Sequence, residues 1–227
     1  MTFLEKPEVL HTQLNFNDII CLGSVVADHD NNITLAEKQA VERGVAKRRR
    51  EYATGRWLAR YALAAIGVNR FDLLPGQAGQ PVWPNNIVGS ITHADKYAAA
   101  VVTSRLNYHA LGIDVERMGR LERNLFPKVL LPDERQRFIG IDATLIFSIK
   151  ESCYKLLYPL VGDFIDFLDI EVHLDEVRQT FNVCYVGKHK ANEVIEQAEG
   201  EYLIFNGHWL TCMMLKANKA STAEENK

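Results

Sequence analysis

The sequence predicts a protein of the mixed class, in which helices and strands both contribute to the core. Three observations lead to this prediction. Residues 34–67 and 143–158 have helical patterning, residues 88–116 contain short strands with period-two alternation, and residues 169–215 have the pattern of two hairpins. With 227 residues, the chain is long enough for one large domain or two small ones.

The composition excludes several classes of protein. Hydrophobic residues make up 47% and charged residues 24% of the chain, as is ordinary for a soluble globular protein. A formal net charge of -3 gives no general attraction to nucleic acid, and no apolar run reaches transmembrane length. Residues 1–10 lack the apolar core of a signal peptide, and the four cysteines are widely scattered. We therefore expect a reduced protein of the cytoplasm.

The first helical segment begins at Thr34, which can form a capping box with Glu37. Further along, Arg49, Arg56 and Arg60 are spaced to lie on one helical face. Such a row can bind phosphates, because guanidinium groups pair with phosphate oxygens. The alternative is a solvated basic face.

Another face of this helix is apolar and should meet the core: Trp57, Leu58, Tyr61, Ala62 and Ala65. Gly55 within it has three explanations, namely a helix break, a close backbone approach or plain tolerance. Gly67 is a natural end for the helix.

A turn-rich segment at 75–84 leads into a short strand that ends in Thr92 and His93. A buried strand is expected at 97–103, followed by a turn at 104–108 and then an acidic strand. His93 and the acidic residues therefore lie on neighbouring strands, near one cleft. A local hydrogen-bonding role for the histidine is the alternative.

The acidic strand, 111–116, alternates between two faces. Ile113 and Val115 point to one face, while Asp114 and Glu116 point to the other. Two carboxylates one strand period apart repel each other, and a hard divalent cation between them would relieve this repulsion. The alternative is a half-exposed strand with a wet acidic face.

Residues 117–137 are charged and helical in parts, and Glu134, Arg135 and Arg137 are expected to face solvent. The second helix covers 143–158 and should end at Pro159. Its core stripe consists of Ile149, Cys153, Leu156 and Leu157.

Another face of the second helix carries Ser148, Glu151 and Lys155 at i, i+3 and i+7. Glu151 and Lys155 have the spacing of an exposed ion pair. Alternatively, Lys150, Glu151 and Lys155 supply one metal ligand and two cations for phosphate.

The remaining chain is rich in strands. One hairpin is expected from 169–174 and 181–186, and a second from 201–205 and 208–215, turned by Asn206-Gly207. Residues 217–227 are polar and are expected to form a frayed, flexible tail.

Four blocks between about residues 48 and 155 share their order and spacing with one family. They are Arg49-x-x-Tyr-x-x-Gly-Arg56, Pro75-Gly-Gln-Ala-Gly-Gln-Pro-Val-Trp-Pro84 running into Gly89-Ser-Ile-Thr-His93, Gly112-Ile-Asp-Val-Glu116, and Phe147-Ser-Ile-Lys-Glu-Ser-x-Tyr-Lys155. Together they resemble the bacterial 4′-phosphopantetheinyl transferases of the two-lobed type that activate surfactin synthetase or serve as component D of enterobactin synthetase. The acidic strand followed by the Lys-Glu-Ser helix is highly specific for this family.

The resemblance implies a reaction: the phosphopantetheine arm of coenzyme A moves to a serine of an apo carrier protein, and adenosine 3′,5′-bisphosphate is released. It places Mg²⁺ on Asp114, Glu116 and Glu151, with Glu151 also as the general base. It places the pyrophosphate at Lys155 and a phosphate of coenzyme A at His93. The coenzyme A site so implied consists of Arg48 or Arg49, Arg56, Thr92, His93, Asp114, Lys150, Glu151 and Lys155.

The chain departs from the family pattern at Gln80, where several relatives have a lysine. One cationic contact to the nucleotide is therefore missing, and Arg48 or Lys47 is the candidate to replace it.

The resemblance also implies an α+β fold with two similar lobes related by pseudo-twofold symmetry and the active site at their interface. We place an N-terminal lobe at 1–106, a C-terminal lobe at 107–216 and a tail at 217–227. A monomer is expected. The expected partners are apo peptidyl or aryl carrier domains of nonribosomal peptide synthesis, of a siderophore pathway. The alternatives are a broad-range or fatty-acid carrier enzyme, a non-catalytic coenzyme A-binding module, and a metal-dependent nuclease or nucleotide hydrolase.

Overall fold

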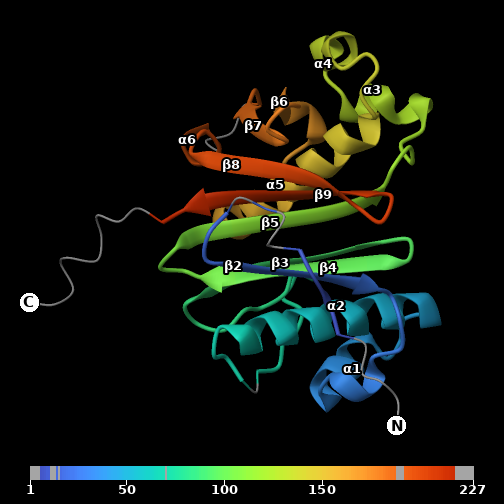
Figure 1. Cartoon of the computed structure of the whole chain (residues 1–227), viewed down its shortest axis with the longest axis vertical. Coiled ribbons are helices and arrows are strands. Elements are labelled where there is room, and N and C mark those ends of the chain that lie inside the picture. Colours follow the sequence, from blue (N-terminus) through green and yellow to red (C-terminus); the bar gives the residue numbers. More distant parts are fainter. Residues whose placement is uncertain (1–5, 11–13, 15, 70, 188–191, 218–227) are drawn as a thin grey trace, which may run out of the picture.

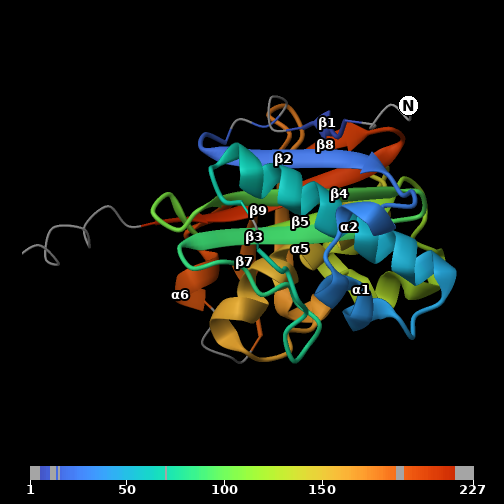
Figure 2. The ribbon, with the colours of Figure 1, turned by 90° about the horizontal axis from the view of Figure 1, so that it is seen from below.

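Two antiparallel sheets form the centre of the structure, and each packs against one long helix (Figures 1 and 2). The computed structural model describes residues 6–10, 14, 16–69, 71–187 and 192–217. Of the expected tail at 217–227, residues 218–227 lie outside the described residues. Because helices and sheets both contribute to the packed structure, the predicted mixed class is confirmed.

The four-stranded sheet has the order β1-β2-β4-β3, and the five-stranded sheet has the order β5-β9-β8-β7-β6. The strands are β1 Glu8–Val9, β2 Ile19–Val25, β3 Ile87–Ala94, β4 Tyr97–Ser104, β5 Tyr108–Arg117, β6 Ile170–Asp175, β7 Thr180–Tyr185, β8 Ala198–Phe205 and β9 His208–Lys216. The α-helices are α1 Leu35–Val41, α2 Ala46–Ala65, α3 Phe126–Val129, α4 Pro132–Arg137, α5 Ala143–Val161 and α6 Asn192–Ile195. Short 3-10 helices are η2 Asp30–Asn32, η3 Arg123–Leu125 and η4 Phe167–Asp169.

Several local predictions are confirmed. Thr34 and Glu37 form the expected capping box at the start of α1. Asn206 and Gly207 turn the β8–β9 hairpin with φ values of 49° and 74°. The predicted end of the second helix at Pro159 is wrong, because α5 continues to Val161 and ends at Gly162, which has the left-handed φ of 72°.

Gly55 and Gly112, two of the glycines in the predicted motifs, lie where a helix approaches a strand. A Cβ atom on Gly112 of β5 would lie 1.8 Å from the Ser152 carbonyl oxygen of α5, so this strand and this helix touch through their backbones. A Cβ atom on Gly55 of α2 would lie 2.7 Å from Cγ2 of Ile91 on β3. Gly55 is thus approached by a side chain and not by a backbone, and α2 continues through it without a break. On the apolar face of α2, Tyr61 and Ala65 are exposed, contrary to the prediction.

The strands of the two sheets follow the same order. In the first sheet, β2 pairs with β4 and β4 pairs with β3, and in the second, β5 pairs with β9 and β9 pairs with β8. In both cases the long helix follows the first of these strands in sequence and precedes the other two. We call each sheet together with its long helix a unit. The β6–β7 hairpin is present only in the second unit, which contains β5 and α5.

Each of the two units also contains one buried ion pair between a glutamate and a basic residue. Glu37 of α1 and Glu134 of α4 both occupy the N3 position of their helix and accept the backbone N–H of the N-cap residue, and both are 0% exposed. Arg60 of α2 donates to Glu37 at 2.6 Å, and Lys150 of α5 donates to Glu134 at 2.7 Å. The prediction that Glu134 faces solvent is therefore wrong, because α4 turns this side chain towards Lys150 of α5.

The sheets meet along β3 and β5, which run parallel with a constant offset of 23 residues. The Ser90 hydroxyl accepts the Ile113 N–H at 3.2 Å, and the Thr92 hydroxyl accepts the Val115 N–H at 3.3 Å. Because β5 is an edge strand, these amides have no partner within their own sheet. The side chains of β3 thereby fix the position of the acidic strand.

Within the described ranges, no helix has the length and apolar character needed to cross a bilayer.

Candidate active site

Asp114 on β5 is the centre of a hydrogen-bonded cluster that joins both units. Its Oδ1 accepts from Lys155 Nζ at 2.6 Å and from the Thr92 hydroxyl at 3.0 Å. Its Oδ2 accepts from the Ser148 hydroxyl at 2.9 Å. Asp114 is only 4% exposed, so its charge is offset mainly by these donors.

The other two predicted carboxylates surround this cluster. Glu116 is 8% exposed and forms an ion pair with Arg120 at 2.5 Å. Burial, and then the charge of Asp114, raise the pKa of Glu116 to about 7, although Arg120 opposes the shift. Burial also raises the pKa of Glu151, with Asp114 adding to the shift and Lys155 opposing it. The charge of Asp114 therefore destabilises the charged forms of both glutamates.

The donor set suits a hard divalent cation, because it consists of carboxylate oxygens that repel one another in a partly buried site. Among the described residues, however, no group of three histidine, cysteine or acidic side chains is arranged to hold a metal ion. Lys155 and Arg120 instead pair with Asp114 and Glu116. The residues fit Mg²⁺ chemically, while their present side-chain arrangement is that of an ion-pair network.

Glu116→Gln should stabilise the metal-free protein at high pH. The pKa of Glu116 is raised by folding, so the folded state favours the protonated form, and stability falls as pH rises from about 4.5 to about 7. Allowing for solvent screening, the gain at pH 8 is about 1–2 kcal/mol, and it disappears at pH 4. Thermal unfolding of both proteins in a metal chelator at the two pH values measures this difference. A variant less stable than wild type at pH 8 would contradict it.

His93 forms the second part of the site. Arg48 Nη1 lies 2.8 Å from His93 Nε2, and Glu51 Oε2 lies 3.7 Å from His93 Nδ1. Since a guanidinium group can only donate, Nε2 is the acceptor and the ring proton is on Nδ1, facing Glu51. Burial lowers the pKa of His93, and Arg48 lowers it further, while Glu51 opposes both. The imidazole is therefore neutral near pH 7 and can gain a proton when an anion arrives.

Glu51 was missed by the sequence predictions, although it lies inside the first motif, next to Tyr52. Glu51→Gln should remove the one nearby charge that most favours protonated His93. We expect the Kd for coenzyme A to rise about 5- to 10-fold at pH 7, and less at pH 5.5, corresponding to about 1 kcal/mol. Calorimetric titration at the two pH values tests this, and an unchanged Kd at both would contradict it.

The predicted arginines separate in the structure. Arg48 is the one beside His93, whereas Arg49 is exposed and donates to the Gly44 carbonyl at 3.0 Å. Arg56 is 5% exposed, donates to the Leu73 carbonyl at 2.7 Å and lies 4.2 Å above the Tyr52 ring.

Lys150 does not reach the site. It is 0% exposed, and it donates to Glu134 and to two backbone carbonyls at 2.8 and 3.0 Å. All the hydrogen atoms of its ammonium group are therefore used, and none is left for a phosphate. The prediction of Lys150 as a phosphate cation conflicts with this burial.

A cavity of about 370 Å³ opens beside Lys155, between β3, β5 and the end of α5. Its apolar lining includes Trp83, Val88, Ile91, Leu111, Tyr154 and Tyr158. Gln80 also lines it, so the residue that departs from the family pattern belongs to this cavity and not to the surface near Arg48.

Two family models match the chain. The model described as "4'-phosphopantetheinyl transferase N-terminal domain" matches residues 36–103, and the one described as "4'-phosphopantetheinyl transferase superfamily" matches residues 110–211.

Similar proteins of known name include transferases and a synthase component. The 4′-phosphopantetheinyl transferase Svp of Streptomyces mobaraensis is 36% identical over 84% of this chain and 81% of its own length. The 4′-phosphopantetheinyl transferase Npt of Nocardia iowensis is 34% identical over 78% of this chain and 87% of its own. Enterobactin synthase component D of Escherichia coli (strain K12) is 35% identical over 48% of this chain and 54% of its own.

Proposed function

The chain belongs to the 4′-phosphopantetheinyl transferase superfamily, and we propose that it transfers the phosphopantetheine arm of coenzyme A to a serine of an apo carrier protein. The observation that carries this proposal is the cluster of Thr92, Asp114 and Lys155 at the junction of β3, β5 and α5. The cluster places an acidic group and a cation together. Its Thr92 is next to His93 on β3, and His93 contacts Arg48 of α2.

The phosphates of coenzyme A are assigned to the cations of this site. Arg48 and His93 bind one phosphate at the nucleotide end. Arg56 adds positive charge from a buried position, where the Leu73 carbonyl and the Tyr52 ring hold its guanidinium group. Lys155 holds the pyrophosphate. Thr92 helps to position the Lys155 ammonium group, because its hydroxyl accepts a hydrogen bond from Nζ at 3.1 Å.

The pantetheine arm is assigned to the cavity beside Lys155. Lys155, to which the pyrophosphate is assigned, lines this cavity, and residues of β3, β5 and the end of α5 form its mainly apolar walls. Its volume of about 370 Å³ suits a slender chain of amides and methylene groups.

In the reaction, the oxygen of the carrier serine attacks the phosphorus that bears the pantetheine arm. The bond from this phosphorus to the bridging pyrophosphate oxygen breaks, and adenosine 3′,5′-bisphosphate leaves. Glu151 takes the serine proton, for which its raised pKa is suited. Asp114, Glu116 and Glu151 would hold Mg²⁺, which supplies positive charge to the pyrophosphate oxygens when bound. The raised pKa values of Glu116 and Glu151, to which the charge of Asp114 contributes, support this assignment.

We also propose that the two units are lobes related by pseudo-twofold symmetry, with the active site at their interface. The shared strand order, the two equivalent Glu–cation pairs and the hydroxyl contacts from β3 to β5 support this. The boundary near residue 106 is supported by the gap between the two family matches. The monomeric state and the cytoplasmic location remain predictions.

The pathway is the narrower part of the proposal. We infer peptidyl or aryl carrier domains of siderophore synthesis, and the similarity to enterobactin synthase component D supports this. The longer matches to Svp and Npt carry no pathway in their names, so a fatty-acid carrier belongs in every assay.

Product release tests the reaction. The protein is incubated with coenzyme A and Mg²⁺, with and without an apo carrier domain, and adenosine 3′,5′-bisphosphate is measured by chromatography. A transferase releases this nucleotide only when the carrier is present. Release without a carrier would instead indicate a hydrolase, and its absence with every carrier would contradict the proposed transfer.

A further inference from the structure

The buried side of Asp114 is held by the Ser148 hydroxyl, which is in turn contacted by the Thr211 hydroxyl. Ser148 of α5 and Thr211 of β9 are both 0% exposed. Thr211 is the register partner of Asp114 across β5 and β9, so the two side chains share one face of the sheet. Because neither hydroxyl is accessible, neither can touch a substrate, and any effect on the reaction must pass through Asp114.

The directions of these hydrogen bonds are determined by the available protons. Ser148 Oγ donates its only proton to Asp114 Oδ2 at 2.9 Å. Thr211 Oγ1 lies 3.0 Å from Ser148 Oγ and 3.0 Å from the Ser148 carbonyl oxygen, and an ionised carboxylate and a carbonyl can only accept. The Ser148 proton is therefore committed to Asp114. The Thr211 proton goes to the Ser148 carbonyl oxygen, and Thr211 Oγ1 also lies against Ser148 Oγ.

We propose that Ser148 and Thr211 are positioning residues that fix the rotation of the Asp114 carboxylate. Oδ2 is held inwards by Ser148, so Oδ1 is presented to Thr92 and Lys155 in the cleft. This inference rests on the proposed role of Asp114 as a metal ligand. Groups that orient a metal ligand commonly change metal affinity or activity by about 10- to 100-fold when they are removed.

The test compares five variants with wild type: Ser148→Ala, Thr211→Val, Thr211→Ser, Ser152→Ala and Asp114→Asn. Thr211→Val keeps the shape and removes the hydroxyl, and Thr211→Ser keeps the hydroxyl. Ser152 is a matched control, because it is also 0% exposed on α5 but donates to the Ile149 carbonyl of its own helix. The measurements are Mg²⁺ affinity by calorimetry in the presence of coenzyme A, the melting temperature, and kcat and KM for an apo carrier domain.

We expect Ser148→Ala and Thr211→Val to weaken Mg²⁺ binding about 10- to 100-fold and to lower kcat, with little change in KM for the carrier. Thr211→Ser and Ser152→Ala should stay near wild type. A merely structural role would lower the melting temperature and leave Mg²⁺ affinity intact. Folded Ser148→Ala and Thr211→Val proteins with wild-type Mg²⁺ affinity, alongside a weakened Asp114→Asn, would overturn this inference alone. Unchanged affinity in Asp114→Asn would overturn the proposed metal site as well.

Discussion

Replacing Glu151 with glutamine is expected to lower kcat for carrier modification about 10²- to 10⁴-fold, the range typical for loss of a positioned general base. Glutamine keeps the size of the side chain but cannot take the serine proton, and it is a weaker ligand for Mg²⁺ than a carboxylate. The raised pKa of Glu151 comes first from burial and then from Asp114, so the wild-type rate should rise with pH as this carboxyl group ionises. The measurement is the single-turnover rate of carrier modification at several pH values.

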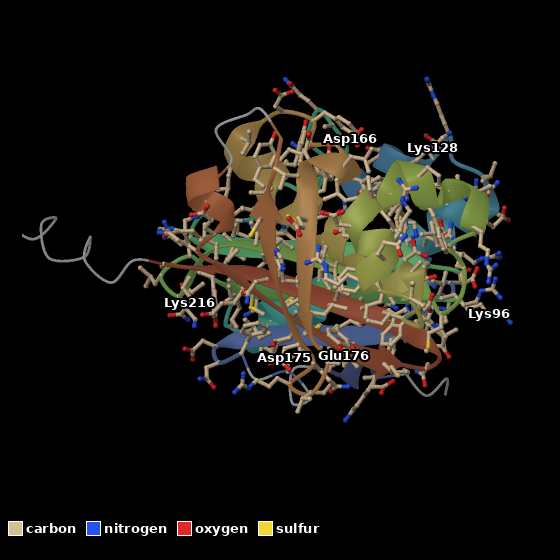
Figure 3. The ribbon with its side chains drawn as sticks, turned by 90° about the horizontal axis from the view of Figure 1, so that it is seen from above. Lys96, Lys128, Asp166, Asp175, Glu176 and Lys216 are labelled. Atoms are coloured by element: carbon tan, nitrogen blue, oxygen red, sulfur yellow. The ribbon has the colours of Figure 1, made fainter. Side chains whose placement is uncertain are left out.

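Glu176→Gln is the matched control for this substitution. Glu176 is exposed in the turn between β6 and β7 (Figure 3). Its substitution by glutamine makes the same chemical change outside the proposed site. It should retain the wild-type rate. A Glu151→Gln enzyme within about threefold of wild type would exclude Glu151 as the base, since that corresponds to less than about 1 kcal/mol of transition-state stabilisation.

Glu134→Ala is expected to lower the free energy of unfolding by about 3–5 kcal/mol, because it leaves the Lys150 ammonium group buried without its counter-charge. Lys150 and Glu134 are both 0% exposed, and burial lowers the pKa of Lys150 below its usual value. Glu134 also accepts backbone N–H groups at 2.8 Å from Leu131 and Val172. The loss therefore loosens α4, α5 and β6 together. Urea denaturation at pH 7 measures it.

The exposed pair Arg178–Asp175 provides the control for this prediction. Its side chains are 80% and 38% exposed, so Asp175→Ala should cost less than about 1 kcal/mol. The double variant Glu134→Leu with Lys150→Met should recover part of the stability, because it removes both charges and fills the space with apolar groups. A loss below about 1 kcal/mol for Glu134→Ala would show that the buried pair is not a main support of the second unit.

Periodicity and turn chemistry were sufficient to predict most of the elements. The capping box at Thr34 and the Asn206-Gly207 turn depend on residues close in sequence, and both are confirmed. The acidic strand also forms, but it is buried on both faces, since Ile113, Asp114, Val115 and Glu116 are all buried. The helix end at Pro159 was mistaken, because a proline in the last turn loses few hydrogen bonds and Gly162 provides the actual C-terminal cap.

Sequence reasoning selected Asp114 and Lys155 as partners in one candidate site, but it did not predict which charged residues are buried or which hydroxyl groups contact them. Asp114 and Lys155 are 41 positions apart, and their 2.6 Å contact depends on how α5 packs against β5. Charge alone indicated that Lys150 binds phosphate and Glu134 faces water, yet tertiary packing pairs them in the core. Thr211 could not be found from the sequence, since its role comes from its register opposite Asp114. Ser148 was placed on the correct helical face without a function.

The peripheral charges show why single residues were hard to judge. Lys96, Lys128, Asp166, Asp175, Glu176 and Lys216 belong to the charged side chains around the edge of the structure (Figure 3). Nothing in their local sequence separates them from Lys150 or Glu134. The distinction between a surface charge and a buried pair is made by the contacts between distant segments.

The central claim is tested most directly by the intact mass of apo carrier domains after incubation with coenzyme A, Mg²⁺ and this protein. An aryl or peptidyl carrier domain and a fatty-acid carrier are measured in parallel, with Glu151→Gln and a Mg²⁺-free sample beside them. The account predicts a mass gain of one phosphopantetheine arm on the aryl or peptidyl domain, greatly reduced in both controls. No gain on any carrier, with coenzyme A still bound to the protein, would contradict the transferase assignment and indicate a binding module.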